Sequence, residues 1–400
     1  MLKRYVACLV VLMPVLLAGP AHAADSRWIR SPGSPGDWYD QGNWDLGVPG
    51  DWDDAHVDNG GIAHISYGTC EANVFVGYDG TGAVHQTGGT VNPTWHIQLG
   101  QNAGSSGQYL FDGGIISGAH SNIYVGWYGH GEFVQDGGSI QSLNMLSVSR
   151  DDGSTGVYDL KSGSIESRLV KIGQHGTGQF AHTGGSFNCP DRFYLATEID
   201  ADGRYDLSGT GVLTTVTEFV GSEGLGRFRQ DGGTHSISSE LTLGRDGGAR
   251  GEYVITGGSL DATSLRVASS GNAMFKVSGP LAAISVDTYV QASGGELISD
   301  ITRGGISTIE TGLVATFDGM WEVLDNGAGI GRFDVLAANG GITGNFDSVT
   351  LPGADWSWGI DTAPGGDTLW VVHVPEPATV GLLCLGAVGI VSRRRKGAVR

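Results

Sequence analysis

The acidic run 198–203, Glu-Ile-Asp-Ala-Asp-Gly, has the residue types and spacing of the first half of a D-x-D-x-D-G calcium loop. Glu198, Asp200 and Asp202 would supply carboxylate oxygens, which are the ligands that Ca²⁺ prefers. The twelfth position of such a loop would be Gly209, where a bidentate Glu is needed, and the surrounding pattern is typical of strands. We therefore favour acidic turns that face solvent, with an extracellular calcium site as the alternative.

No motif of a known catalytic chemistry stands in the sequence. The eleven histidines include no i,i+2 pair on a strand and no H-E-x-x-H, and there is no G-x-S-x-G or G-K-[ST]. Carboxylates distant in sequence could still be stacked by the fold, as in glycan-cleaving enzymes. We nevertheless expect a protein that is not an enzyme and uses no cofactor.

The charge balance bears on the partners. The chain of 400 residues has 23 basic and 42 acidic residues. The two ends hold seven of the basic residues and one acidic residue, so the part between them carries 16 basic and 41 acidic residues, a net charge of −25. Such a body repels phosphate backbones, and we expect no nucleic-acid partner. Cations and neutral glycans are compatible with this charge.

Residues 1–23 have the features of a secretory signal peptide. Lys3 and Arg4 form the basic start, residues 6–17 form the apolar run, and Ala21 and Ala23 frame an A-x-A cleavage site. The pattern predicts cleavage by signal peptidase and a mature chain that begins at residue 24. An uncleaved membrane helix is the alternative, which the short apolar run disfavours.

The last residues combine a short motif, an apolar stretch and a basic cluster. Residues 378–391 are apolar but number only fourteen, so they predict a short transmembrane helix. The cluster after it predicts that the tail stays inside and the body outside. The motif is Pro375, Glu376 and Pro377, and the cluster begins with Arg393, Arg394 and Arg395.

Residues 374–400 resemble the PEP-CTERM sorting signal of Gram-negative and related bacteria, a tail that is also labelled an ice-binding protein C-terminal domain. The resemblance implies that an exosortase cuts at the Pro-Glu-Pro motif and passes the protein to the envelope, cell surface or extracellular matrix. The chain would then be anchored to the membrane only transiently. A generic tail anchor is the alternative. Ice binding itself has little support, because Thr215-Val216-Thr217 is not repeated in the neighbouring units.

The region between the ends is built of repeats. Units of 22–25 residues follow the pattern G-x-aromatic-x-x-x-G-G-[ST]-apolar, later apolar-x-apolar-G. Each unit predicts three short strands and none contains a helix-length amphipathic stretch. The units begin at Gly82, Gly107, Gly131, Gly156, Gly178, Gly203, Gly226 and Gly251, with a degenerate ninth at Ala273.

These repeats predict an all-β protein, a right-handed parallel β-helix (β-solenoid) with one coil per unit and about nine coils. The aromatic positions, from Tyr109 to Phe275, should then stack inside as a ladder; a glycan-binding stripe is the alternative. A β-propeller with two units per blade is the alternative fold. The Gly-rich units, with their Y-x-x-x-G-G-[ST] pattern, also resemble autotransporter passenger proteins.

The predicted organisation has five parts. Residues 1–23 are the signal peptide, 24–81 a Trp-rich cap with a first half-coil, 82–295 the repeats, 296–373 a C-terminal β cap, and 374–400 the sorting signal. A carbohydrate site built from Trp and Asp is the alternative for residues 24–60. Cys70 and Cys189 should lie too far apart for a disulfide and be buried, a reactive or intermolecularly bridged thiol being the alternative.

Together these features predict an exported structural or adhesion protein of the cell surface or matrix. Signal peptidase, exosortase and, before processing, the membrane are the expected partners, and exopolysaccharide is a further candidate. The alternative is a β-helix that binds or cleaves polysaccharide.

Overall fold

The computed structural model describes residues 24–374. The predicted signal peptide and transmembrane helix, with the processing residues Ala21, Ala23, Pro375 to Pro377 and Arg393 to Arg395, lie outside the described residues. Within residues 24–374, no helix is long and apolar enough to cross a membrane.

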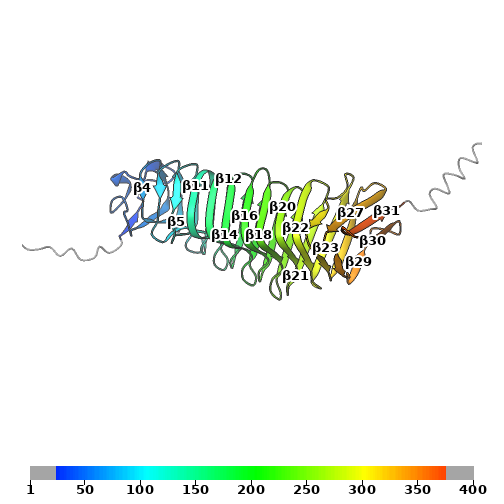
Figure 1. Cartoon of the computed structure of the whole chain (residues 1–400). Helices are drawn as coiled ribbons and strands as arrows, with labels where there is room; N and C mark the ends of the chain where they lie inside the picture. Colours follow the sequence, from blue (N-terminus) through cyan, green and yellow to red (C-terminus); the bar gives the residue numbers. More distant parts are fainter. Residues whose placement is uncertain (1–23, 375–400) are drawn as a thin grey trace, which may run out of the picture.

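Each repeat forms one turn of a long parallel β-solenoid, so the predicted fold class is confirmed. Figure 1 shows an elongated rod with the N-terminal segment at one end and the C-terminal segment at the other. Strands of one unit pair in parallel with the equivalent strands of the next, as β13 (Thr177–His182) does with β15 (Asp202–Leu207). The propeller alternative is wrong, because consecutive units are stacked in register along one axis.

The strands lie in three ladders, and the longer ones bend through more than one of them. From the N-terminal end they are β1 Asp25–Arg27, β2 Pro35–Asp37, β3 Asp54–Ile65, β4 Thr69–Cys70, β5 Asn73–Gln86, β6 Thr90–Val91, β7 His96–Leu99, β8 Ser106–Phe111, β9 Ile115–Ser117, β10 Asn122–Val125, β11 His130–Val148 and β12 Thr155–Ile172, with the 3-10 helix η1 Gln41–Asn43 between β2 and β3. After β13 follow β14 Ser186–Leu195, then β15, β16 Val212–Val220, β17 Leu225–Gln230, β18 Thr234–Leu243, β19 Arg250–Ile255, β20 Gly258–Val267, β21 Asn272–Ser278, β22 Ala282–Gln291 and β23 Gly295–Thr302. The last are β24 Ile309–Thr311, β25 Ala315–Phe317, β26 Met320–Asn326, β27 Gly331–Ala338, β28 Ile342–Gly344, β29 Ser348–Thr350, β30 Trp356–Ala363 and β31 Gly366–His373.

The ladder is longer than the repeats predict. On the N-terminal side, β3 pairs in parallel with β1, β2 and β5; on the C-terminal side, β23 pairs in parallel with β26. The solenoid therefore has about 13 turns, where the recognisable repeats indicate nine. The flanking segments adopt the same coil with sequences too divergent to match the pattern.

The aromatic positions from Tyr109 to Tyr253 form a stacked column in the core, as predicted, whereas Phe275, the last predicted member, is buried but tilted by 51° against Tyr253. From Tyr109 to Tyr253, successive ring centroids lie 4.6–5.0 Å apart and the rings are within 22° of parallel. All of these rings are buried, so the alternative of an exposed glycan-binding stripe is wrong. The column consists of Tyr109, Phe133, Tyr158, Phe180, Tyr205, Phe228 and Tyr253.

The two ends of the rod are closed differently. Near the N-terminal end, Trp38 and Trp44 pack edge to face at 4.8 Å, and Trp44 also packs against Trp28. At the C-terminal end, β31 pairs antiparallel with both β27 and β30, which departs from the parallel ladder and covers an edge. Such covers limit the pairing of open sheet edges with other chains.

Candidate functional site

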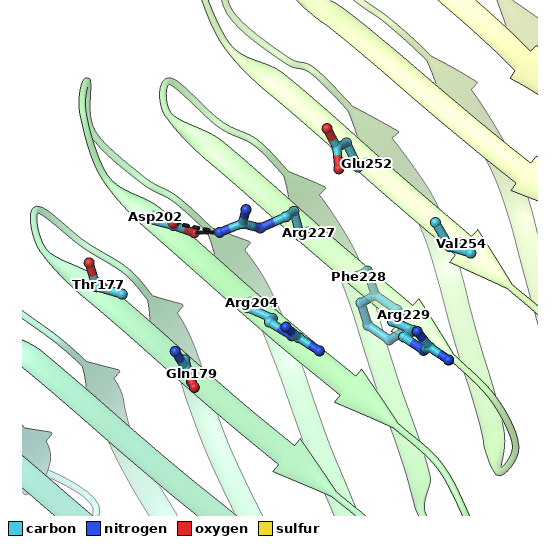
Figure 2. A pocket seen from close by; sticks show the side chains of 9 residues that line it. All are labelled: Thr177, Gln179, Asp202, Arg204, Arg227, Phe228, Arg229, Glu252 and Val254. Atoms are coloured by element: carbon cyan, nitrogen blue, oxygen red, sulfur yellow. Dashed lines mark hydrogen bonds and ion pairs between the residues drawn. The ribbon is translucent and has the colours of Figure 1, made fainter.

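A groove lined by arginines lies on the outward face of β13, β15, β17 and β19. Outward positions alternate with the inward ring positions, so Arg204, Arg227 and Glu252 occupy equivalent places in successive coils. Figure 2 shows these side chains with Arg229 and Asp202 over the neighbouring strands. The hollow between them has a volume of about 280 Å³ and is also lined by Thr177, Gln179, Phe228 and Val254.

Each arginine of this groove already has a carboxylate partner. Arg204 makes two hydrogen bonds to Asp206, of 2.7 and 3.0 Å. The pKa of Arg204 is raised by its hydrogen bond to Asp206, and Arg227 is ion-paired with Asp202. The groove therefore presents alternating paired charges. Because these arginines are ion-paired, the groove does not present a strip of unpaired cations that could bind a polyanion.

Arg229 follows the same rule. Its Nε donates to both carboxylate oxygens of Asp231, at 3.0 and 2.9 Å. The pKa of the Asp231 carboxyl is lowered, because the hydrogen bonds from Arg229 and Thr256 together outweigh burial, the largest single influence, which acts to raise it. The ion pair is part of the surface of the solenoid.

The predicted calcium residues do not converge. The Asp202 carboxylate is taken by the guanidinium of Arg227, while Glu198 and Asp200 lie in the turn before it. Within residues 24–374, the group of carboxylates and imidazoles close enough to share an ion is a different one. The calcium alternative therefore gains no support from Asp202, because Arg227 from the next coil is ion-paired with that carboxylate.

That different group consists of Asp25, Asp54 and His56 at the N-terminal end, whose ligand atoms lie within 4.8 Å of one another. Asp25 on β1 is the register partner of Asp54 on β3, and His56 stands two residues later on the same face. Burial lowers the pKa of His56, which favours the neutral imidazole that metal ions bind. These three side chains are able to hold a divalent ion; the sequence does not bring Asp25 together with the other two until β1 and β3 are paired.

One pair of oppositely ionisable side chains, a histidine and a glutamate, is enclosed in the core. His235 and Glu218 are both fully buried, and His235 Nε2 lies 2.9 Å from Glu218 Oε2. The other ring nitrogen, Nδ1, lies 2.9 Å from the Tyr253 hydroxyl. The neighbouring coils have apolar side chains at the same places, Leu213 and Leu260 beside His235. The pair is enclosed in the solenoid and no outside molecule reaches it.

Both cysteines of the body are free and buried, as predicted. Burial raises the pKa of each thiol to about 12. Because the thiolate is the reactive form, burial of Cys70 and Cys189 favours the predicted packing role over the alternative of a reactive thiol.

Comparison with known proteins identifies the tail. Residues 373–396 match the model of the PEP-CTERM protein-sorting motif. Neither the curated proteins nor the solved structures yielded a match to the chain. The likeness to autotransporter passengers and the ice-binding label therefore stay predictions. The sorting motif marks an exported protein that is processed by exosortase and destined for the cell surface, and here its cargo is a parallel β-solenoid.

Proposed function

We propose that this chain is a non-catalytic structural or adhesion component of the cell surface or extracellular matrix. The observation that carries the proposal is the position of the sorting motif, which begins at residue 373, where the last strand of a solenoid of about 13 turns ends. A rigid rod delivered to the cell surface by its tail has the form of a spacer or scaffold. The groove charges support this proposal, since they are engaged in ion pairs within one coil or between successive coils.

Processing can be tested by intact-mass analysis of the protein recovered from the surface or medium of the cells that make it. We expect a chain that begins at residue 24 and ends near Pro375. A Glu376→Ala variant should remain uncut and keep Arg400. A wild-type product that retains Arg400 would contradict exosortase processing and would favour the alternative of a generic tail anchor.

The absence of catalysis has its own test. The purified body, residues 24–374, is incubated with a panel of neutral and acidic polysaccharides, and new reducing ends and unsaturated uronates are measured. We expect no release of product above the rate of a heat-denatured sample. Release of product that persists through purification and scales with protein concentration would overturn the non-catalytic proposal.

A further inference from the structure

The tryptophans of residues 24–60 are of two kinds. Trp28, Trp38 and Trp44 are buried and pack against one another in the cap. Trp52 is 55% exposed, although it stands only eight residues after Trp44. Packing in the cap explains why Trp28, Trp38 and Trp44 are tryptophans, but it does not explain the exposed ring of Trp52.

The backbone of Trp52 is left-handed, with φ 69°. This region is costly for a side chain with a Cβ and is unusual for a bulky one. The turn that holds it is well fixed: the Asp53 carboxylate accepts hydrogen bonds from the amides of Gly50, at 2.8 Å, and Ala24, at 2.9 Å. Glycine would fit this position without strain. Strain held by its surroundings at an exposed aromatic residue is typical of a binding site.

A second exposed tryptophan lies opposite. Trp95 is 52% exposed, and its ring centroid is 6.2 Å from that of Trp52, with 70° between the planes. Thr94 Oγ1 donates to Asp51 Oδ1 at 3.2 Å and ties the two turns together. The amide of Trp95 donates to Asn73 Oδ1 at 2.9 Å. Two turns 43 residues apart thus hold their rings as the floor and wall of an open corner.

A polar hollow begins beside this corner. Asp51 and Thr94, the residues before the two tryptophans, line a cavity of about 300 Å³. Its other polar side chains include Glu71, Asn92 and His120. Carboxylate and amide oxygens accept hydrogen bonds from hydroxyl groups, and two carboxylates disfavour an anionic ligand. An amphipathic aromatic surface next to hydroxyl acceptors matches a sugar, which has apolar ring faces and a rim of hydroxyls.

We propose that Trp52 and Trp95 form a binding site for a neutral polysaccharide. A sugar ring lies in the corner between the two indoles, and the hydroxyls of the chain are hydrogen-bonded by Asp51, Glu71 and Asn92. The proposal rests on the exported location and deepens the proposed function, because it names the class of matrix polymer that the rod would hold.

The test is affinity electrophoresis of the body, residues 24–374, through native gels that contain hydroxyethyl cellulose, laminarin, dextran or alginate. We expect at least one of the three neutral glucans to retard the wild-type protein. Trp52→Gly and Trp95→Ala should each weaken binding, so that the apparent dissociation constant obtained from the retardation rises at least tenfold. Trp358→Ala is the matched control, since that ring is 39% exposed at the other end of the rod.

The Trp52→Gly variant also separates binding from folding. Because glycine relieves the left-handed strain, its melting temperature should not fall. The proposal is overturned if no neutral glucan retards the protein, if only alginate does, or if Trp52→Gly binds as wild type does. None of these outcomes bears on the ends found by mass analysis, so a failure here leaves the structural role of the rod standing.

Discussion

At the scale of single residues, the core follows a rule with a period of two coils. Where the ring is Phe133, Phe180 or Phe228, the residue two places later is polar, namely Gln135, His182 or Gln230; the last coil of the series, with Phe275, has the apolar Val277 instead. The Tyr of the next coil forms a hydrogen bond with that side chain, as between Tyr158 and Gln135 at 2.7 Å. The amide nitrogen of Gln135 in turn donates to the Gly137 and Ser164 carbonyls. The four phenols of the ring column, those of Tyr109, Tyr158, Tyr205 and Tyr253, thus each have a hydrogen-bond partner inside the core.

His182 breaks the pattern of glutamines and should make stability depend on pH. Burial lowers its pKa from 6.5 to about 4, and its Nδ1 lies 2.7 Å from the Tyr205 hydroxyl. The imidazole binds a proton more readily in the unfolded chain than in the folded one. The contribution of neutral His182 to the free energy of unfolding is therefore complete above about pH 6.5 and is lost as the pH falls toward 4. The expected loss is about 2 kcal/mol by pH 5.

The matched variant is His182→Gln, which places at this position the residue found in equivalent coils. Urea denaturation at pH 7.5 and pH 5 should show that the variant lacks this part of the acid sensitivity. At pH 7.5 its free energy of unfolding should be within about 1 kcal/mol of wild type. Equal acid sensitivity in the two proteins would contradict the assignment to His182.

The Glu218–His235 pair predicts strong coupling between two substitutions. Glu218→Leu or His235→Leu alone leaves a buried polar partner without its mate and should cost about 3 kcal/mol or more. The double variant restores the apolar stacks of the neighbouring coils, and Tyr253 keeps its 2.7 Å bond to Gln230. Its stability should return to within about 1 kcal/mol of wild type. Additive losses in a double-mutant cycle by urea denaturation would refute this account.

At the scale of elements, the first glycine of each unit marks a close approach of two chain segments. In the coil of β17, the start of the strand packs against the turn that precedes it. A Cβ at Gly226 would therefore lie 2.0 Å from the amide nitrogen of Gly221 in that turn. Removing this clash requires a backbone shift in a packed core. The glycine is thus a steric requirement of the coil, which is why it recurs at the same place in eight units.

Gly226→Ala should therefore destabilise the protein by about 3 kcal/mol, measured as a lower midpoint of thermal or urea unfolding. Gly247→Ala is the control, because nothing lies within 4 Å of a Cβ at that exposed turn. That variant should be neutral or slightly stabilising, by about 0.5 kcal/mol. Comparable losses in the two variants would show that the cost comes from elsewhere than the close approach.

The sequence predicts the elements where the repeat is regular. The ring column and the parallel coils follow from the spacing of glycines and aromatic residues. Corner residues are harder to predict: most are Gly, yet Ser149, Ala196 and Ala268 adopt the same positive φ, because tertiary packing overrides local preference. The extra coils at both ends have no repeat signature.

The candidate sites were predicted less well, for a physical reason. Asp202 and Arg227 are 25 residues apart, and no local motif shows that one neutralises the other. Trp52 and Trp95 meet only after three successive coils have stacked, because the coil of Asn73 lies between theirs. In a solenoid, the contacts of a side chain depend on residues in neighbouring coils, which are distant in sequence. The sequence therefore marks the tryptophans as candidates for a carbohydrate site, but only the structure shows which of them are buried and which are exposed.

At the scale of the molecule, we expect the solenoid to tolerate the deletion of two successive coils better than the deletion of one. Deleting residues 131–155 takes out the coil of Phe133 and Gln135, and brings Tyr158 over the coil of Tyr109 and Phe111, where its hydroxyl has no acceptor. Deleting residues 131–177 removes both Phe133 and Tyr158 with their coils, and the alternation continues from Tyr109 to Phe180.

The larger deletion should therefore be the better tolerated. A buried phenol without a partner costs about 1–3 kcal/mol, whereas stability in a repeat array depends mainly on neighbouring coils and changes little with their number. We expect the two-coil deletion to unfold cooperatively at a higher temperature than the one-coil deletion, as followed by circular dichroism. Adding Tyr158→Phe to the one-coil deletion should recover most of the difference, since it removes the orphaned hydroxyl. If the one-coil deletion is the more stable of the two, the solenoid is built of independent single coils and the Tyr–Gln bonds do not set its period.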